Sequence, residues 1–339
     1  MNIPLPLPNK IAVPPVVLLV SGDEYAVAWA TTRRSTGTLS VSTGNKTQLF
    51  HSTSAGMLRH NDKLHVVRVA KSVLDNCDSY HVQNHAMLYN TGYVALRGRR
   101  VTSPRYHFTS YRDQSTIHAL FCTDVHGEQK RAIQNARALQ QKTGAAPNLI
   151  LLGGDIPNDG LHSRRSFTKG VLRLAAKLGG SEIPVLYARG NHETRGQWAT
   201  ELPHYIGDLY FTANYGPISF LVLDNGEDKP DNHPEYSGLA DFAAYRTRQL
   251  AWLNALVTTG HRVALCHAHN LDDTWYPPLN RLGITHLFVG HGHNNSAWVH
   301  QGIHHYEDGG PATTSWLTFQ NDKVTAKSMC NETLTSYQL

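Results

Sequence analysis

The sequence predicts a two-domain protein in which an all-β sandwich (residues 1–113) precedes a layered α/β domain (residues 114–339). Three observations support this fold class. The chain has 339 residues, which exceeds the usual size of one domain. Short strand patterns separated by turn residues fill its first third. Strand and helix patterns alternate from about residue 114 onward, which is typical of a layered α/β domain.

The first unit contains seven apolar segments with the length and spacing of strands in a β-sandwich. The expected strands are 16–20, 25–31, 38–42, 47–51, 64–70, 79–88 and 106–110. Turn residues, such as Gly22-Asp23 and Gly44-Asn45, separate them. Trp29 lies in the middle of an expected strand, and we expect its large side chain to anchor the core of this unit.

The second unit alternates apolar strands with amphipathic helices. The expected strands are 117–122, 148–152, 184–187, 218–223, 262–266 and 286–289, and the expected helices are 128–143, 166–178 and 241–257. In the first of these helices, Ile133, Ala136 and Leu139 recur at helical spacing and predict one buried face.

The composition is that of an ordinary globular protein, with 40% hydrophobic and 17% charged residues, and it excludes a disordered chain. The net charge of +5 favours anionic substrates, but lysine and arginine are spread along the chain and indicate no nucleic-acid partner. The chain contains no run of 18 apolar residues, so the sequence predicts no membrane-spanning helix.

The four cysteines have no C-x-x-C spacing, so we expect no disulfide framework. The first residues lack the basic and apolar regions of a secretory signal. Both features favour a cytoplasmic location, whereas a secreted location stays open if the chain is a trimmed mature form.

Five polar clusters follow directly after expected strands. They are Asp124-Val125-His126, Gly153-Gly154-Asp155, Gly190-Asn191-His192-Glu193, His267 and Gly290-His291-Gly292-His293. The carboxyl ends of strands are where α/β folds place ligands, so these clusters indicate one site. Their carboxylate, imidazole and amide groups favour divalent ions such as Mn, Fe, Co, Ni or Zn.

Seven side chains in these clusters are candidate metal ligands: Asp124, His126, Asp155, Asn191, His267, His291 and His293. They are too many for one tetrahedral ion and suit two ions that share a carboxylate, an arrangement used in phosphoryl displacement. His269 is an alternative to His267, which we favour because it follows its strand directly.

The ordered pattern D-x-H, G-D, G-N-H-[DE], H and G-H-x-H resembles the calcineurin-like metallophosphoesterase family over about residues 114–339. The resemblance implies an α/β sandwich with two mixed sheets and two divalent ions, such as Mn, Fe or Zn. It implies that Asp124, His126 and His293 bind one ion and that Asn191, His267 and His291 bind the other. It also implies that Asp155 bridges the two.

The resemblance also implies a reaction. A hydroxide bridging the two ions would attack phosphorus, and His192 would contact the phosphate and act as the general acid. The candidate catalytic residues are therefore Asp155 and His192. The candidate substrate-binding residues are Asn191, His192 and Arg195.

The order of the two units resembles that of the purple acid phosphatases, which implies a fibronectin III-like N-terminal sandwich. This chain has His126 where that subfamily has glycine, and Asn158 where it has a tyrosinate ligand. His126 would replace the missing ligand, so we expect no purple iron(III) centre. The serine/threonine protein phosphatases are a weaker resemblance, from which we expect Asn158 or Asp159 to orient His192.

The sequence thus predicts a dinuclear-metal hydrolase whose partner is a small phosphate ester, with phosphate monoesters favoured. One alternative is a phosphodiesterase of the same family. The other is a binding protein in which the metal site is vestigial.

Overall fold

The computed structural model describes residues 8–111, 116–257, 260–268, 271–310, 313–320, 323–330 and 333–339. Strands dominate its first third. They are β1 (Ile11–Leu19), β2 (Glu24–Ser35), β3 (Thr38–Thr43), β4 (Lys46–His51), β5 (Thr53–Ser54), β6 (Met57–Leu58), β7 (Asp62–Ala70), β8 (Ser79–Asn90) and β9 (Ala95–Thr102), with one short helix, α1 (Lys71–Asp75).

The remaining elements alternate as predicted as far as α7, after which the described residues form six consecutive strands. The helices are α2 (Gln129–Thr143), α3 (Arg164–Phe167), the π-helix η1 (Thr168–Leu172), α4 (Arg173–Gly179), the 3-10 turns η2 (His192–Thr194), η3 (Ala199–Glu201) and η4 (Pro234–Tyr236), α5 (Leu202–Ile206), α6 (Phe242–Ala255) and α7 (Tyr276–Leu282). The strands are β10 (Thr116–Cys122), β11 (Leu149–Leu152), β12 (Val185–Tyr187), β13 (Phe211–Tyr215), β14 (Ile218–Val222), β15 (His261–Leu265), β16 (His286–Val289), β17 (Ser296–His300), β18 (Ile303–Glu307), β19 (Thr314–Gln320), β20 (Lys323–Cys330) and β21 (Thr333–Gln338).

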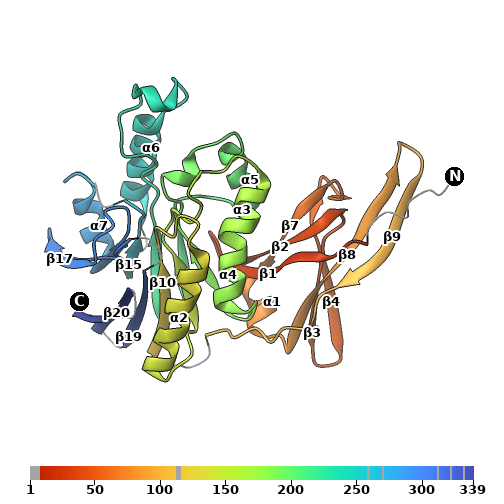
Figure 1. The fold of residues 1–339 in the computed structure, drawn as a ribbon, viewed down its shortest axis with the longest axis horizontal. Coiled ribbons are helices and arrows are strands. Elements are labelled where there is room, and N and C mark those ends of the chain that lie inside the picture. Colours follow the sequence, from red (N-terminus) through yellow and green to blue (C-terminus); the bar gives the residue numbers. More distant parts are fainter. Residues whose placement is uncertain are drawn as a thin grey trace.

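Two mixed sheets form the centre of the second unit (Figure 1). In one, β10, β11 and β12 are parallel and β19 joins them antiparallel. In the other, β14, β15, β16 and β18 are parallel, with β13 and β17 antiparallel at the edges. Phe121 of the first sheet and Phe288 of the second meet in the core between them, with ring centroids 6.0 Å apart. The two mixed sheets predicted for this unit are therefore confirmed.

Helices cover the outer faces of both sheets. Ala136 and Leu139 of α2 are buried together with Leu174 of α4 in one apolar cluster with the first sheet, which confirms the predicted buried face of α2. Leu253 of α6 and Leu279 of α7 are buried against the second sheet. The order of layers is thus helix, sheet, sheet, helix.

The first sheet continues into the N-terminal strands. β1 pairs in parallel with β12 through Leu18 and Val185, and β2 pairs antiparallel with β1. Val17 is buried in the core between the sheets, whereas Leu18 is buried on the helix side. The two predicted units are therefore joined through one sheet and share their cores.

The N-terminal unit differs from the prediction in several features, including the unpredicted short elements β5, β6 and α1. The expected strand 106–110 is wrong, because only Tyr106 forms an isolated bridge with Tyr80. The exposed, arginine-rich strand β9 was not predicted, since its outward side chains lack an apolar alternation. Trp29 is fully buried and donates its indole N–H to Asn84, as its expected core role requires.

Other features of this unit stay predictions. The boundary between 1–113 and 114–339 falls in 112–115, outside the described residues. The fibronectin III-like identity of the strands also stays a prediction.

None of the four cysteines forms a disulfide, and three of them are buried. Among the described residues, no helix has the length and apolar character needed to cross a bilayer.

Candidate metal centre

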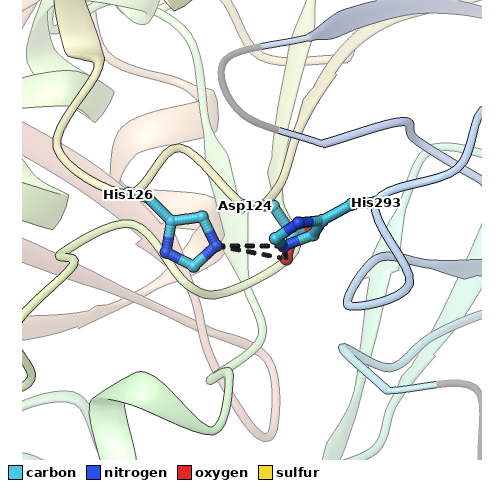
Figure 2. A group of neighbouring side chains, drawn as sticks. All are labelled: Asp124, His126 and His293. Carbon is cyan, nitrogen blue, oxygen red and sulfur yellow. Dashed lines mark hydrogen bonds and ion pairs between the residues drawn. The ribbon is translucent and has the colours of Figure 1, made fainter.

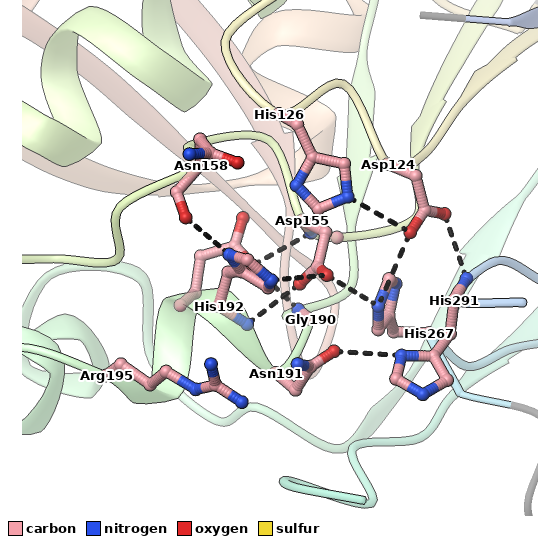
Figure 3. A network of polar contacts seen from close by, with 12 residues as sticks. Asp124, His126, Asp155, Asn158, Gly190, Asn191, His192, Arg195, His267 and His291 are labelled. Atoms are coloured by element: carbon pink, nitrogen blue, oxygen red, sulfur yellow. Dashed lines mark hydrogen bonds and ion pairs between the residues drawn. The ribbon is translucent and has the colours of Figure 1, made fainter. Parts of the chain in front are cut away.

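The five polar clusters meet at the carboxyl ends of the parallel strands. Asp124 follows β10, Asp155 follows β11 and Asn191 follows β12 in the first sheet. His267 and His291 follow β15 and β16 in the second. The two sheets are packed face to face, so these chain segments converge at one edge of the sandwich (Figure 3).

Glycines allow these segments to approach closely. A Cβ atom on Gly190 would lie 2.2 Å from Asp155 Oδ1, and one on Gly290 would lie 2.3 Å from Asp124 Oδ2. Real side-chain atoms do not approach so closely, so any other residue at either position would displace a carboxylate of the site. The first glycines of the G-N-H-E and G-H-x-H clusters are therefore needed because a side chain there would overlap a carboxylate, and not only because of turn geometry.

Asp124, His126 and His293 form the first donor group (Figure 2). Asp124 Oδ1 lies 3.2 Å from His293 Nε2 and 3.7 Å from His126 Nε2. The two Nε2 atoms are 3.1 Å apart. The other carboxylate oxygen of Asp124 accepts hydrogen bonds from the Thr123 hydroxyl and the His291 backbone N–H, so Oδ1 is turned toward the histidines.

Asp155, His267 and His291 form the second donor group (Figure 3). Asp155 Oδ2 lies 3.2 Å from His267 Nε2. Asn191 joins this group through its Oδ1, which lies 3.0 Å from His291 Nδ1. The structure therefore brings all seven predicted ligands together in the two predicted sets, with Asp155 placed between them. Their role as metal ligands stays a prediction. His269 lies outside the described residues.

A hydrogen bond on the side away from the aspartates orients the ring of His267. Its Nδ1 donates to the Gly153 carbonyl at 2.7 Å, which leaves Nε2 facing the two aspartates. Such a bond to the outer ring nitrogen is the usual support of a metal-binding histidine. Burial opposes a charge on this ring, but Asp155 and Asp124 outweigh burial and raise the pKa of His267 to about 10. The two carboxylates thus strongly favour a positive charge at this position.

Two observations indicate that these residues fit divalent ions. Asp124 Oδ1 and His267 Nε2 are buried and make no well-directed hydrogen bond, and each only faces other groups of the site at 3.2 Å or more. In addition, nine non-glycine residues described by the structure have positive φ, and five of them are predicted ligands: Asp124, His126, Asp155, His291 and His293. Backbone strain of this kind concentrates at functional sites, where it fixes the direction of a side chain.

The family of this chain follows from its sequence. The family model of the calcineurin-like phosphoesterases matches residues 117–295, which is more than half of the chain and includes every predicted ligand. This chain belongs to the calcineurin-like phosphoesterase family.

Solved structures similar to this calcineurin-like phosphoesterase each align with 66% of its chain. A dimetal phosphatase from Danio rerio is 14% identical, is covered over 98% of its length and has a TM-score of 0.46. GAP50, the anchor in the inner membrane complex of Plasmodium, is 12% identical, is covered over 88% and has a TM-score of 0.47. Vacuolar protein sorting 29 from Cryptosporidium parvum is 13% identical, is covered over 97% and has a TM-score of 0.36. No curated protein matches the sequence significantly.

His192 lies beside the donor groups of this phosphoesterase-family site. Its Nδ1 donates to the backbone carbonyl of Asn158 at 2.5 Å, and its Nε2 lies 3.7 Å from Asp155 Oδ2. Because a carbonyl only accepts, Nδ1 carries a proton and Nε2 faces the site. From the sequence we expect the side chain of Asn158 or Asp159 to orient His192, but the contact is made by the backbone carbonyl of Asn158. The exposed Asn158 side chain donates to Asp159 instead, so the main chain supplies the contact.

Glu193 has a structural role that sequence reasoning missed. Its buried carboxylate accepts backbone N–H bonds from Asp155, Ile156 and Gly190 at 2.9–3.0 Å. Burial and the nearby charge of Asp155 raise the pKa of Glu193 to about 7. Glu193 thereby joins the loop after β11 to the loop after β12. Its place in the G-N-H-E cluster could have marked Glu193 as part of the site, but the sequence does not show which loops it joins.

Asp228 is a second residue that was missed. Its Oδ2 lies 3.5 Å from His291 Nε2, and it comes from the long connection between β14 and α6. No motif marks this position, so the sequence carries no signal for it.

Arg195, a predicted substrate-binding residue, is paired with acidic groups. It donates from two nitrogens to Glu227 at 2.7 and 2.9 Å, and its third nitrogen lies 2.7 Å from Glu235. Its charge is therefore compensated within the protein, and its role toward substrate stays a prediction.

Proposed function

We propose that this protein is a metal-dependent hydrolase of phosphate esters that uses two divalent ions. The observation that carries the proposal is the pairing of two donor groups, Asp124–His126–His293 and Asn191–His267–His291, on either side of Asp155. Two ions bound there would supply Lewis acidity, lower the pKa of a bound water and screen the charge of the phosphate.

The side chains of Asp155, His192 and Asn191 would each have a separate role in the reaction. Asp155 would link the two groups, because its Oδ2 faces His267 of one group and its carboxylate lies within 4.8 Å of a ring nitrogen of His126 of the other. Its Oδ1 accepts the backbone N–H of His192 at 2.8 Å, which holds the carboxylate in place. His192 would hold a proton at Nε2 and deliver it to the leaving oxygen, since its Nδ1 is engaged by the Asn158 carbonyl. Asn191 would hold substrate beside this group.

We further propose that phosphate monoesters are the preferred substrates, with phosphodiesters as the alternative. A monoester presents three terminal oxygens and a diester only two. Three imidazoles, those of His192, His291 and His293, are partly exposed at the open side of the site, with 25%, 24% and 45% of their side-chain surface accessible. Because His291 and His293 would hold the ions, the two cations and the His192 ring would contact the terminal oxygens, and a monoester offers one more such oxygen than a diester.

The test compares hydrolysis of p-nitrophenyl phosphate and bis(p-nitrophenyl) phosphate by Mn²⁺-loaded protein, with Asp155→Ala as the blank. Faster hydrolysis of the monoester supports a phosphatase, and faster hydrolysis of the diester supports a phosphodiesterase. Hydrolysis of neither substrate above the blank would contradict the proposed activity.

A further inference from the structure

A basic groove lies between the N-terminal strands and the helices of the phosphoesterase unit. It is a cavity of about 770 Å³ whose walls come from β1, β2 and β7 on one side and from α3, η1 and α4 on the other. In Figure 1 these helices stand next to β1 and β2. Its lining includes six lysines and arginines, namely Arg34, Lys63, Arg164, Arg165, Lys169 and Arg173, and no aspartate or glutamate. None of the predicted metal ligands lines it.

The positive charge of the basic groove is concentrated. The whole chain carries a net charge of +5. The six positive charges around this one cavity therefore exceed the net charge of the entire protein. Arg165, Lys169 and Arg173 recur at every fourth residue, which places them along one side of the helical segment. Desolvation and then the charges of Arg165 and Arg173 lower the pKa of Lys169, so the three cations repel one another.

Most of these cations have no acidic partner. Within the ranges that the structure describes, only Arg164 forms an ion pair, with Asp62, which also accepts the Tyr205 hydroxyl. The pair fixes the arginine at the groove wall, and its Nε is buried without a hydrogen-bond partner. Among the described residues, the other five cations of the groove have no such ion pair, so an anionic ligand would compensate their charge.

The π-helix η1 lies in this wall. Thr168 and Lys169, its first residues, both line the groove. Single π turns within α-helices are uncommon and are frequent at functional sites. Here the π turn joins α3 to α4 and sets the direction of the side chains on either side of it.

We propose that the basic groove is a second binding site, separate from the metal centre, for a compact ligand carrying several phosphate groups. The volume is that of a small-molecule site, on the order of 300–1,000 Å³. Cations on two facing walls suit several phosphates better than one, and arginine binds phosphate with two parallel hydrogen bonds. The apolar lining residues Ala12, Val13 and Trp198 would accept a non-charged part of the ligand. This inference is independent of the proposed function.

The probe is inorganic tripolyphosphate, titrated calorimetrically into the full chain. The groove variant combines Arg165→Gln, Lys169→Gln and Arg173→Gln. The matched control combines Arg97→Gln, Arg99→Gln and Arg100→Gln, which removes the same charge from exposed positions of β9. All titrations are repeated in an Asp155→Ala background, where turnover and binding at the metal centre are impaired.

We expect the groove variant to weaken tripolyphosphate binding about tenfold or more, the β9 control to change it less than twofold, and Asp155→Ala alone to preserve it. The single change Lys169→Gln, at an exposed position, should weaken binding measurably, so the test does not depend on the fold of the triple variant. Absence of binding, equal weakening by both triple variants, or loss of binding in Asp155→Ala would each overturn the proposal. Tighter, groove-dependent binding of a single-stranded oligonucleotide would also overturn it, in favour of a nucleic-acid surface.

Discussion

The backbone N–H of Asp155 donates to the buried carboxylate of Glu193 at 2.9 Å. This bond joins the loop that carries the central carboxylate of the site to the loop that carries Asn191 and His192. The same carboxylate oxygen also accepts the N–H of Gly190, so one side chain fixes both loops. The geometry of the donor groups therefore depends on a residue that itself contributes no predicted ligand.

Glu193→Ala should lose both stability and metal. Three buried N–H groups would lose their acceptor, and at about 1–3 kcal/mol for each group this lowers the unfolding free energy by at least about 3 kcal/mol. Glu193→Gln keeps one acceptor oxygen and should fall between the alanine variant and the parent. Urea unfolding and metal content measured on the same samples test this prediction. Unchanged values for the alanine variant would show that Glu193 does not hold the site.

His192→Ala should lower kcat about 100-fold or more while metal content stays unchanged, because His192 is proposed to protonate the leaving group. The loss should be larger for an alkyl phosphate than for p-nitrophenyl phosphate, since an alkoxide needs a proton more than p-nitrophenolate does. An equal loss for both substrates would instead indicate that His192 only positions the phosphate.

Asn158→Ala and Asp159→Ala should each keep kcat within about twofold of the parent. The contact to His192 comes from the backbone carbonyl of residue 158, which alanine retains. His192→Ala serves as the reference for full loss of this interaction. A tenfold decrease in either alanine variant would show that a side chain, rather than the main chain, orients His192.

The stability of the N-terminal strands should decline in acid because of His65. Its ring is buried, and Nε2 lies within hydrogen-bond distance of Thr31 and Ser35. Burial lowers the pKa of His65 from its ordinary value of 6.5 to about 4. Between these values the unfolded chain takes up a proton that the folded chain does not. Unfolding free energy should therefore be retained above pH 6.5 and fall by roughly 3 kcal/mol as the pH drops to 4.

The measurement compares urea unfolding from pH 7 to pH 4 for the parent, His65→Gln and His51→Gln. His51 is an exposed histidine of β4 and serves as the matched control. His65→Gln should flatten the decline, whereas His51→Gln should leave it unchanged. Because the glutamine also alters packing, the variants are compared by how steeply their unfolding free energy falls with pH, and not by its absolute value.

The predicted ligands could be found from the sequence because each follows an apolar strand closely. Short-range patterns identify Asp124, Asp155 and His267, and face-to-face packing of the two mixed sheets brings the ends of their parallel strands together. The supports of these ligands could not be found in this way. The Gly153 carbonyl behind His267 and the Asn158 carbonyl behind His192 are main-chain groups, which any residue carries.

Long-range pairing also escaped sequence reasoning. Leu18 and Val185 lie in parallel neighbouring strands although most of the two units separates them along the chain. Strand patterns show which segments are strands but not which strands pair. The basic groove was missed for the same reason, since Arg34 and Arg173 belong to distant segments and no dense basic tract marks them.

The central claim is that two ions bind on either side of Asp155, and the number of metal ions bound per chain tests it most directly. Metal analysis of the Mn²⁺-saturated parent, His126→Ala, His267→Ala and Asp155→Ala should be combined with p-nitrophenyl phosphate hydrolysis. The account predicts two ions in the parent, weakened binding of one ion in each histidine variant, and loss of both ions and of hydrolysis in Asp155→Ala. Full hydrolysis in a chain that binds fewer than two ions, or in Asp155→Ala, would contradict it.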